Sequence, residues 1–229
     1  MSKAIGFAVF NTGDSDGKVA VRCLFAWLSD ILRTNSVETL EEGFVVKGFF
    51  FDLDGTLVDT HQANFEAYRL ALQEAGFTLT FEDFKRSIGH HAGTFLPWFA
   101  PGLNKAGYDA IRQSKAEHYD GLVHLSKLNS ELVTFMELMQ GNQLVLVTTA
   151  SRRNAQGVLS HHGLEKHFQY IITGNDVENL KPEPDAYLLA LQKTGLKPTE
   201  ALAFEDSETG RRAAEAAGIQ VAMINKFLP

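Results

Sequence analysis

The sequence predicts an α/β protein built on a doubly wound parallel sheet. Short apolar runs alternate with amphipathic segments of about ten residues, which is the pattern of strands joined by crossover helices. In addition, the first such run is almost wholly apolar, as expected of a parallel strand that is buried on both faces. The expected strands are residues 45–51, 144–147, 170–172, 201–204 and 220–224.

The first expected strand ends in an unusual group of polar residues, Asp52-Leu53-Asp54-Gly55-Thr56. Ligands of open α/β sheets bind just beyond the carboxyl ends of the strands, so this group stands where a ligand is expected. Two acids so close together repel each other, and burial without compensation costs several kcal/mol or keeps one of them protonated. A divalent cation is the simplest remedy.

Helices are expected between and after these strands. A helix follows Asp59 and ends at Gly76, and the spacing of Thr80 and Asp83 predicts the start of a second helix that runs to Ser87. Residues 88–93 are predicted to be a loop, and the block 63–128 carries no strand signal of its own. Further helices are expected at 105–122, 130–139, 152–162, 184–194 and 207–217.

Residues 1–44 precede this pattern. Residues 4–10 are predicted to form a strand and 11–17 a polar turn. Residues 18–25 fit a returning strand, whereas the apolar positions from 21 to 33 also fit one face of a helix, and both interpretations stay open. The segment is expected to pack on the core or to form a subunit contact.

Composition narrows the class of protein. With 45% hydrophobic residues the chain can bury a substantial core, and a formal charge of −7 argues against nucleic acid or an anionic membrane as a partner. A single cysteine, Cys23, excludes an internal disulfide and fits a reducing cytoplasm. No apolar run approaches the roughly 20 residues of a membrane span, and no secretory signal is expected.

Four motifs at strand ends, in order along the chain, resemble those of the haloacid dehalogenase superfamily. They are Asp52-x-Asp54-Gly55-Thr56, Thr149 after the second strand, Lys181-Pro-x-Pro, and Glu205-Asp206 after the fourth strand. The helical insertion is similar to that of the subclass containing β-phosphoglucomutase and phosphoglycolate phosphatase. The resemblance implies an α/β core of residues 45–62 and 129–229, a helical cap of 63–128, and an N-terminal extension of 1–44 that departs from the pattern.

The resemblance also implies roles for the motif residues. Asp52 is the expected nucleophile, Asp54 the general acid and base, and Lys181 a cation beside the phosphoryl group. Thr149 is expected to donate to a phosphoryl oxygen, although Thr148 is adjacent and either threonine could simply cap the following helix. The implied cofactor is Mg²⁺, with oxygen ligands expected from Asp52, the carbonyl of Asp54, Asp206 and Glu205; for Glu205 a metal role and simple charge balance both remain open.

The implied function is Mg²⁺-dependent hydrolysis of a small phosphorylated metabolite, such as a sugar phosphate, by a monomer or homodimer. A phosphomutase of the β-phosphoglucomutase type is the first alternative function. Such a mutase is expected to carry a histidine at position 64 and an arginine at 92, and this chain has Asn64 and Ala92, which disfavours it. A non-catalytic binding module is the second rival. The further candidates for substrate binding are Gly55, Thr56, Ala150, His61, Asn64, His90, His91 and Lys115.

Overall fold

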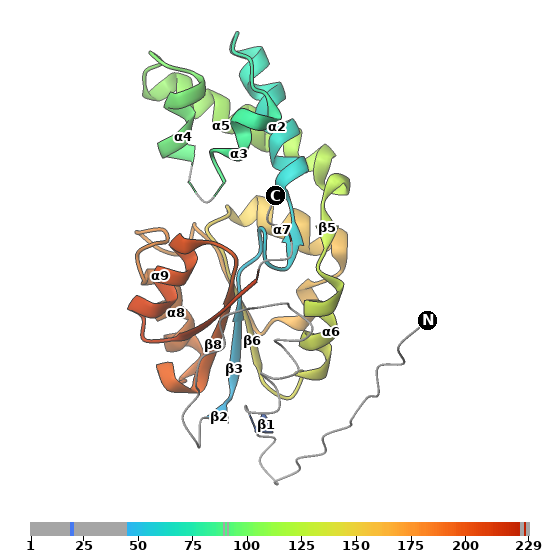
Figure 1. The fold of residues 1–229 in the computed structure, drawn as a ribbon, viewed down its shortest axis with the longest axis vertical. Coiled ribbons are helices and arrows are strands. Elements are labelled where there is room, and N and C mark those ends of the chain that lie inside the picture. The colour runs from blue at the N-terminus through green and yellow to red at the C-terminus, as the bar shows by residue number, and fades with distance from the viewer. Residues whose placement is uncertain (1–18, 21–44, 89, 91, 225–226, 228–229) are drawn as a thin grey trace.

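A five-stranded parallel sheet forms the centre of the molecule in the computed structural model, which describes residues 19–20, 45–88, 90, 92–224 and 227. The strand order is β7-β6-β3-β8-β9, so the chain starts in the middle and winds outward in both directions (Figure 1). The doubly wound α/β fold expected from the sequence is confirmed. The strands are β3 (Gly48–Phe51), β6 (Gln143–Val147), β7 (Tyr170–Ile172), β8 (Ala201–Glu205) and β9 (Gln220–Met223).

Helices cover both faces of this sheet, two of them on each face. Successive side chains of a strand point to opposite faces. Phe50 therefore packs in the cluster formed with α8 and α9, whereas Phe49 and Phe51 pack in the cluster formed with α6 and α7. These helices are α6 (Ser130–Leu138), α7 (Arg152–His162), α8 (Asp185–Thr194) and α9 (Glu208–Ala216).

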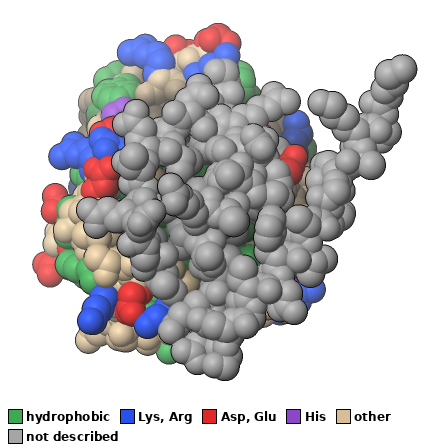
Figure 2. Space-filling model, turned by 60° about the horizontal axis from the view of Figure 1, so that its bottom comes forward, with side chains coloured by type: hydrophobic (Ala, Val, Ile, Leu, Met, Phe, Trp, Pro, Cys, Tyr) green, Lys and Arg blue, Asp and Glu red, His purple; other side chains and the backbone are tan. Residues whose placement is uncertain are grey.

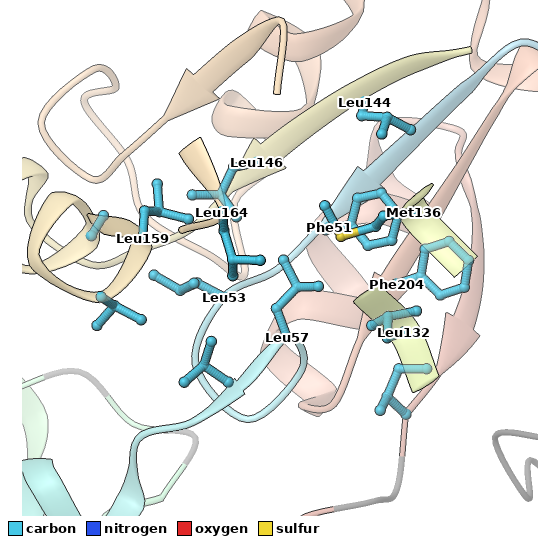
Figure 3. Packing of buried hydrophobic residues seen from close by; sticks show 14 of the residues in the cluster. Phe51, Leu53, Leu57, Leu132, Met136, Leu144, Leu146, Leu159, Leu164 and Phe204 are labelled. Carbon is cyan, nitrogen blue, oxygen red and sulfur yellow. The ribbon is translucent and has the colours of Figure 1, made fainter. Parts of the chain in front are cut away.

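The turn after β3 is held in place by two buried leucines. Leu53, which lies within the acidic motif, and Leu57, which directly follows it, are both fully buried, and Leu57 N donates a hydrogen bond to Leu53 O at 3.1 Å. Figure 3 shows both side chains pointing into the same apolar cluster as Leu146 and Leu164. Burial of such a side chain contributes roughly 1.5–3 kcal/mol, so this turn is anchored to the core.

The register of the strands aligns their carboxyl ends. Phe51 is the Cα partner of both Leu146 and Phe204, and its ring stacks on that of Phe204 at a centroid distance of 4.9 Å. Asp52 N then donates to Phe204 O at 3.0 Å. The residues that follow β3, β6 and β8 consequently meet at one edge of the sheet.

A separate group of helices lies beyond this edge (Figure 1). Its own apolar cluster includes Phe65, Leu72, Phe84 and Leu96, and helices α2 and α5 pair closely. The group occupies the segment expected to be a cap, although the proposed domain boundaries stay a prediction. Its helices are α2 (His61–Glu74), α3 (Phe81–Lys85), α4 (Ala92–Phe99) and α5 (Lys105–Leu122).

One detail of the expected cap was wrong, and the structure adds one short strand to it. The predicted loop at 88–93 is shorter, because α4 already begins at Ala92 and continues past Pro97. The block 63–128 does contain a strand, since β5 (Lys127–Leu128) pairs antiparallel with β4 (Val58–Asp59). Strands of two residues are too short to show an alternating pattern, so they carry no signal in the sequence.

The segment before the core is described only at one short strand. β1 (Val19–Ala20) pairs antiparallel with β2 (Val45–Val46). The expected strand at 4–10, the turn at 11–17, Cys23 and the alternative helix face at 21–33 lie outside the described residues. On the face shown in Figure 2, acidic and basic side chains are interspersed along the visible edge. Within the described ranges, no helix has both the length and the apolar character required to cross a bilayer.

Candidate active site

Lys181 joins the ends of three strands through its ammonium group. Its Nζ donates to Asp52 Oδ1 at 2.7 Å, to Glu205 Oε1 at 2.6 Å and to Val147 O at 2.8 Å. All three ammonium protons are used, and both carboxylates are buried with the lysine. The sequence-based expectation that Lys181 lies against Asp52 agrees with this geometry.

Asp206 reaches the same place from the residue after β8. Thr56 Oγ1 donates to Asp206 Oδ1 at 3.2 Å, and Thr56 is fully buried. Gly55 has φ = +87°, and a Cβ atom at this position would lie 2.1 Å from Asp206 Oδ2. Glycine is therefore required both by the backbone conformation and by the approach of the carboxylate. The hydroxyl of Thr56 engages Asp206, and the expected contact of Thr56 with substrate stays a prediction.

Three carboxylates thus converge on one point. One oxygen from each of Asp52, Glu205 and Asp206 lies within 4.8 Å of the others. Burial, together with the neighbouring acids, raises the pKa of Asp52 well above its usual value and that of Asp206 to about 7. Burial alone lowers the pKa of Lys181, but the charges of Asp52 and Glu205 raise it above its ordinary value. One lysine faces three acids, so the cluster favours a further cation.

The donor set of this cluster fits Mg²⁺. Glu205 is fully buried, and among the described residues its Oε2 has no hydrogen-bond partner. A buried, unpartnered carboxylate oxygen is costly unless a cation or ordered water satisfies it. Mg²⁺ prefers oxygen ligands and retains some of its water. The carbonyl of Asp54 stays a predicted additional ligand.

Asp54 is held by residues at the start of α2. Thr60 Oγ1 donates to Asp54 Oδ1 at 2.5 Å, and Asn64 Nδ2 donates to Thr60 Oγ1 at 3.0 Å. Asn64 was expected to contact substrate, and in the structure it orients Thr60. Thr60 was not identified from the sequence, where a threonine just before a helix normally indicates a cap.

The two threonines after β6 differ in environment. Thr148 is buried and its Oγ1 accepts a hydrogen bond from Ala150 N at 3.0 Å, whereas Thr149 is exposed at the strand end. The cap of α7 is Ser151, whose side chain accepts from Asn154 N. The alternative interpretation of Thr148 or Thr149 as this helix cap was therefore wrong. The exposure of Thr149 favours it as the residue that meets a ligand.

Lys115 is the buried cation of the cap. Its Nζ lies 3.9 Å from the ring centroid of Tyr119 and 5.3 Å from that of Tyr68. Burial lowers the pKa of Lys115 to about 8, although the charges of Asp54 and Asp120 act in the opposite direction. Across the described residues no carboxylate lies within ion-pair distance of its ammonium group.

The histidines expected at the substrate are placed differently from one another. His90 is exposed, and its ring lies 5.3 Å from that of Trp98 on α4. His61 Nδ1 is 2.8 Å from Asp59 Oδ1, so this ring is engaged at the start of α2. His91 lies outside the described residues. The structure therefore brings neither described histidine into the carboxylate cluster.

Tyr187 on α8 contacts the cluster and was not identified from the sequence. Its hydroxyl donates to Glu205 Oε1 at 2.5 Å, and the residue is fully buried. Burial and the charge of Glu205 raise the pKa of this phenol well above its ordinary value. The residue sits on the apolar face of a helix, where a tyrosine is normally assigned to the core.

The family model described as haloacid dehalogenase-like hydrolase matches residues 49–224, well over half of the chain. The chain therefore belongs to this family, as the four motifs indicated, and it is a phosphoric monoester hydrolase.

Two curated relatives and one solved structure are among the similar proteins. A phosphorylated carbohydrates phosphatase of Thermotoga maritima is 32% identical over 190 residues, which is 76% of this chain and 83% of the relative. A fructose-1-phosphate phosphatase of Escherichia coli is 30% identical over 175 residues, or 75% and 93% of the two chains. A β-phosphoglucomutase of Clostridium difficile has the same fold, with a TM-score of 0.67, 19% identity and coverage of 78% and 84%.

Proposed function

We propose that the protein is a Mg²⁺-dependent phosphatase of small phosphorylated metabolites that acts through a phospho-aspartate on Asp52. The observation that carries the proposal is the buried junction in which Lys181 binds both Asp52 and Glu205 beside Asp206. A sugar phosphate is the preferred substrate class, because two relatives are named for phosphorylated carbohydrates and fructose 1-phosphate. Location in the cytoplasm and a monomeric or homodimeric state stay predictions.

In the first step, a carboxylate oxygen of Asp52 forms a bond to phosphorus while the bond from phosphorus to the ester oxygen breaks. The electron pair of the broken bond goes to the leaving oxygen, which takes the proton of the Asp54 carboxyl group. Lys181 already occupies Oδ1 of Asp52, which leaves Oδ2 as the oxygen expected to attack. Thr60, directly before α2, holds Asp54 through a hydrogen bond to its carboxylate.

In the second step, a water oxygen attacks the same phosphorus and gives a proton to the Asp54 carboxylate. The bond between Asp52 and phosphorus breaks, its electron pair returns to Asp52, and inorganic phosphate is released. Thr149 and Lys181 offer a hydroxyl and a positive charge to the phosphoryl oxygens. Asp52, Asp206 and the carbonyl of Asp54, with Glu205 beside them, would hold Mg²⁺, which would supply positive charge to offset the anionic phosphoryl group.

The number of groups matters because hydrolysis of phosphate monoesters is extremely slow without a catalyst. The largest known enzymatic accelerations of this reaction approach ~10²¹-fold, on the order of 28 kcal/mol of barrier. A single positioned donor contributes about 3–4 kcal/mol. Because no single group lowers the barrier by this amount, a nucleophile, an acid, a lysine and a metal site are required together in one place.

The second candidate function is that of a phosphomutase that uses the same groups. A β-phosphoglucomutase has the same fold, so the experiment below distinguishes the two reactions. Asn64 replaces the histidine that a mutase of this type is expected to carry, and it is engaged with Thr60. This arrangement favours transfer of the phosphoryl group to water over transfer to a second sugar oxygen.

Phosphate release from p-nitrophenyl phosphate and from a panel of sugar phosphates, with and without Mg²⁺, tests the proposal. The expected result is Mg²⁺-dependent release that falls by at least about 10⁴-fold in Asp52→Asn, because the nucleophile is lost. Asp109→Asn is the matched control, since this exposed carboxylate lies on α5 in ion pairs with Lys105 and Arg112. Isomerisation without free phosphate identifies a mutase, and no turnover of any substrate identifies a binding module.

A further inference from the structure

The phenol of Tyr187 is the buried polar group next to the active site that the proposed reaction does not use. Its hydroxyl lies 2.5 Å from Glu205 Oε1, and its ring centroid lies 5.2 Å from Lys181 Nζ. Tyr187 is fully buried in the apolar layer between α8 and the sheet. A buried hydroxyl at this position must find an acceptor, and the acceptor here is a residue of the carboxylate cluster.

Two donors share one oxygen of Glu205. Oε1 accepts from Tyr187 at 2.5 Å and from Lys181 at 2.6 Å, while Oε2 has no partner among the described residues. The carboxylate also lies against the backbone of Gly210, where an added Cβ would lie 1.9 Å from Oε2. The position of the carboxylate is thus defined by a donor pair on one oxygen and by backbone on the other.

Lys181 cannot define this position alone. Its ammonium protons are divided among Glu205, Asp52 and Val147 O, and in the proposed reaction it also attracts the phosphoryl group. The phenol has a single proton, which it donates to Glu205. Tyr187 is therefore the donor that keeps Glu205 oriented while the partners of Lys181 change.

We propose that Tyr187 is a positioning residue that orients Glu205 and thereby sets the affinity of the carboxylate cluster for Mg²⁺. The inference rests on the proposed function, because it assigns a role to Tyr187 at that same metal site. Groups that hydrogen-bond metal-binding side chains typically change metal affinity about 10–100-fold when they are removed. The hydroxyl of Tyr187 acts through Glu205 and does not itself contact substrate.

The test is calorimetric titration of the purified, substrate-free protein with Mg²⁺, comparing wild type with Tyr187→Phe. The ring stays, so packing is kept and only the donor is lost. The expected result is a dissociation constant for Mg²⁺ that rises about tenfold. The Mg²⁺ concentration for half-maximal phosphate release is expected to shift by the same factor. Tyr187→Met also removes the hydroxyl and gives the same expected shift should the phenylalanine variant fail to fold.

Tyr170→Phe is the matched control. Tyr170 lies on β7, packs against the same apolar cluster as Tyr187 and is half-buried, so the same hydroxyl is removed away from Glu205. This variant is expected to bind Mg²⁺ like the wild type. A purely structural role of Tyr187 lowers the melting temperature of the metal-free protein without moving the dissociation constant, and that outcome overturns the inference.

A double variant shows whether Tyr187 acts through Glu205. In a Glu205→Gln background, Tyr187→Phe is expected to weaken Mg²⁺ binding by no more than about twofold, because the carboxylate through which Tyr187 acts is already replaced. A full tenfold loss in that background contradicts the inference. Wild-type protein that hydrolyses phosphate esters but shows no difference from Tyr187→Phe overturns only this role. Wild-type protein that binds no Mg²⁺ overturns the proposed metal site, and this inference with it.

Discussion

Two lysines with the same burial show how differently the core and the cap treat a charge. Lys181 and Lys115 are each 6% exposed. Lys181 is bonded to two carboxylates, and their charges raise its pKa. Lys115 lies against two tyrosine rings, and burial lowers its pKa to about 8. Equal burial thus produces opposite shifts, and the difference is the presence of acids within bonding distance.

The difference in ion pairing suits Lys181 and Lys115 to different roles. In the core, Lys181 is bonded to Asp52 and Glu205 before any ligand arrives, which keeps these groups in one geometry. The cap lysine has no ion-pair partner in the described part of the chain, so an anionic group of a substrate would complete its environment. This interpretation supports the predicted contact between Lys115 and substrate, which stays a prediction.

Among the variants that test this comparison of the two lysines, Lys181→Met is expected to have the largest effect. Removing the shared cation leaves Asp52 and Glu205 facing each other without compensation. Breaking a buried pair of this kind typically costs about 3–5 kcal/mol, and phosphate release is expected to fall by more than about 10³-fold. Urea unfolding and phosphate release measure the two losses.

Lys47→Met is the control for that variant. Lys47 pairs with Glu200 at the surface, with side chains 45% and 24% exposed. Surface pairs contribute about 0–1 kcal/mol, so stability and activity are expected to stay close to those of the wild type. A Lys181→Met protein as stable as Lys47→Met contradicts the central role of the buried junction.

Gly55→Ala is expected to be next in size. The new Cβ meets Asp206 Oδ2 and the backbone has φ = +87°, so both the carboxylate and the turn must move. We expect phosphate release to fall about 100-fold and Mg²⁺ binding to weaken, together with a loss of stability of about 1–3 kcal/mol from the backbone strain.

Gly76→Ala distinguishes the effect of backbone strain from the effect of the contact with Asp206. Gly76 has φ = +83° but no atom within 4 Å of an added Cβ, so this variant carries a similar backbone strain without the contact to Asp206. It is expected to lose stability and retain Mg²⁺ binding. Equal Mg²⁺ affinities of the two alanine variants would show that Asp206 tolerates the extra carbon.

The pH dependence of stability tests Lys115. Its pKa is about 8 in the folded protein against an ordinary 10.5, so the unfolded chain binds more protons between these values. The free energy of unfolding attributable to Lys115 therefore rises from pH 8 to 10.5, by about 3 kcal/mol at most. Urea unfolding across this range should show the rise in the wild type relative to Lys115→Met. Parallel curves for the two proteins mean that the ammonium is well solvated.

The smallest effect is expected at the exposed ion pair between α5 and α7. Arg153 Nη2 lies 2.6 Å from Asp120 Oδ2, with side chains 52% and 48% exposed. A double-mutant cycle with Arg153→Ala and Asp120→Ala is expected to give a coupling energy of about 0.2–1 kcal/mol, which decreases at high salt. A coupling as large as that of the buried Lys181 junction would remove the contrast between the two kinds of pair.

The sequence predicted the five strands and the convergence of Asp52, Lys181, Glu205 and Asp206, because these features follow from local patterns. Apolar runs define strands, and parallel strands bring their carboxyl ends to one edge. The roles assigned to the motif residues stay predictions, even though the geometry supports them.

Contacts of side chains outside the four motifs, or between motif residues other than this convergence, could not be predicted. Tyr187 and Glu205 are 18 residues apart on different elements, and no periodic pattern relates them. The bond from Thr56 to Asp206, 150 residues away in the chain, was not predicted either, and the close approach at Gly55 brings that carboxylate within reach. The start of α4 was missed because Gly93 and Pro97, which usually indicate a break, lie inside its first turns.

The short ribbon of β4 and β5 means that the chain leaves the core and returns to it at neighbouring points. Val58 pairs with Leu128 and Asp59 with Lys127, so the two crossings are hydrogen-bonded to each other. Everything between Thr60 and Ser126 can in principle be exchanged for another insertion through two adjacent junctions, without altering the register of β3 or β6. A chimaera joined at these junctions would keep the reacting groups of the core and carry a different inserted segment above them. Exchange of the insertion is also a route by which evolution can change the substrates of such a protein.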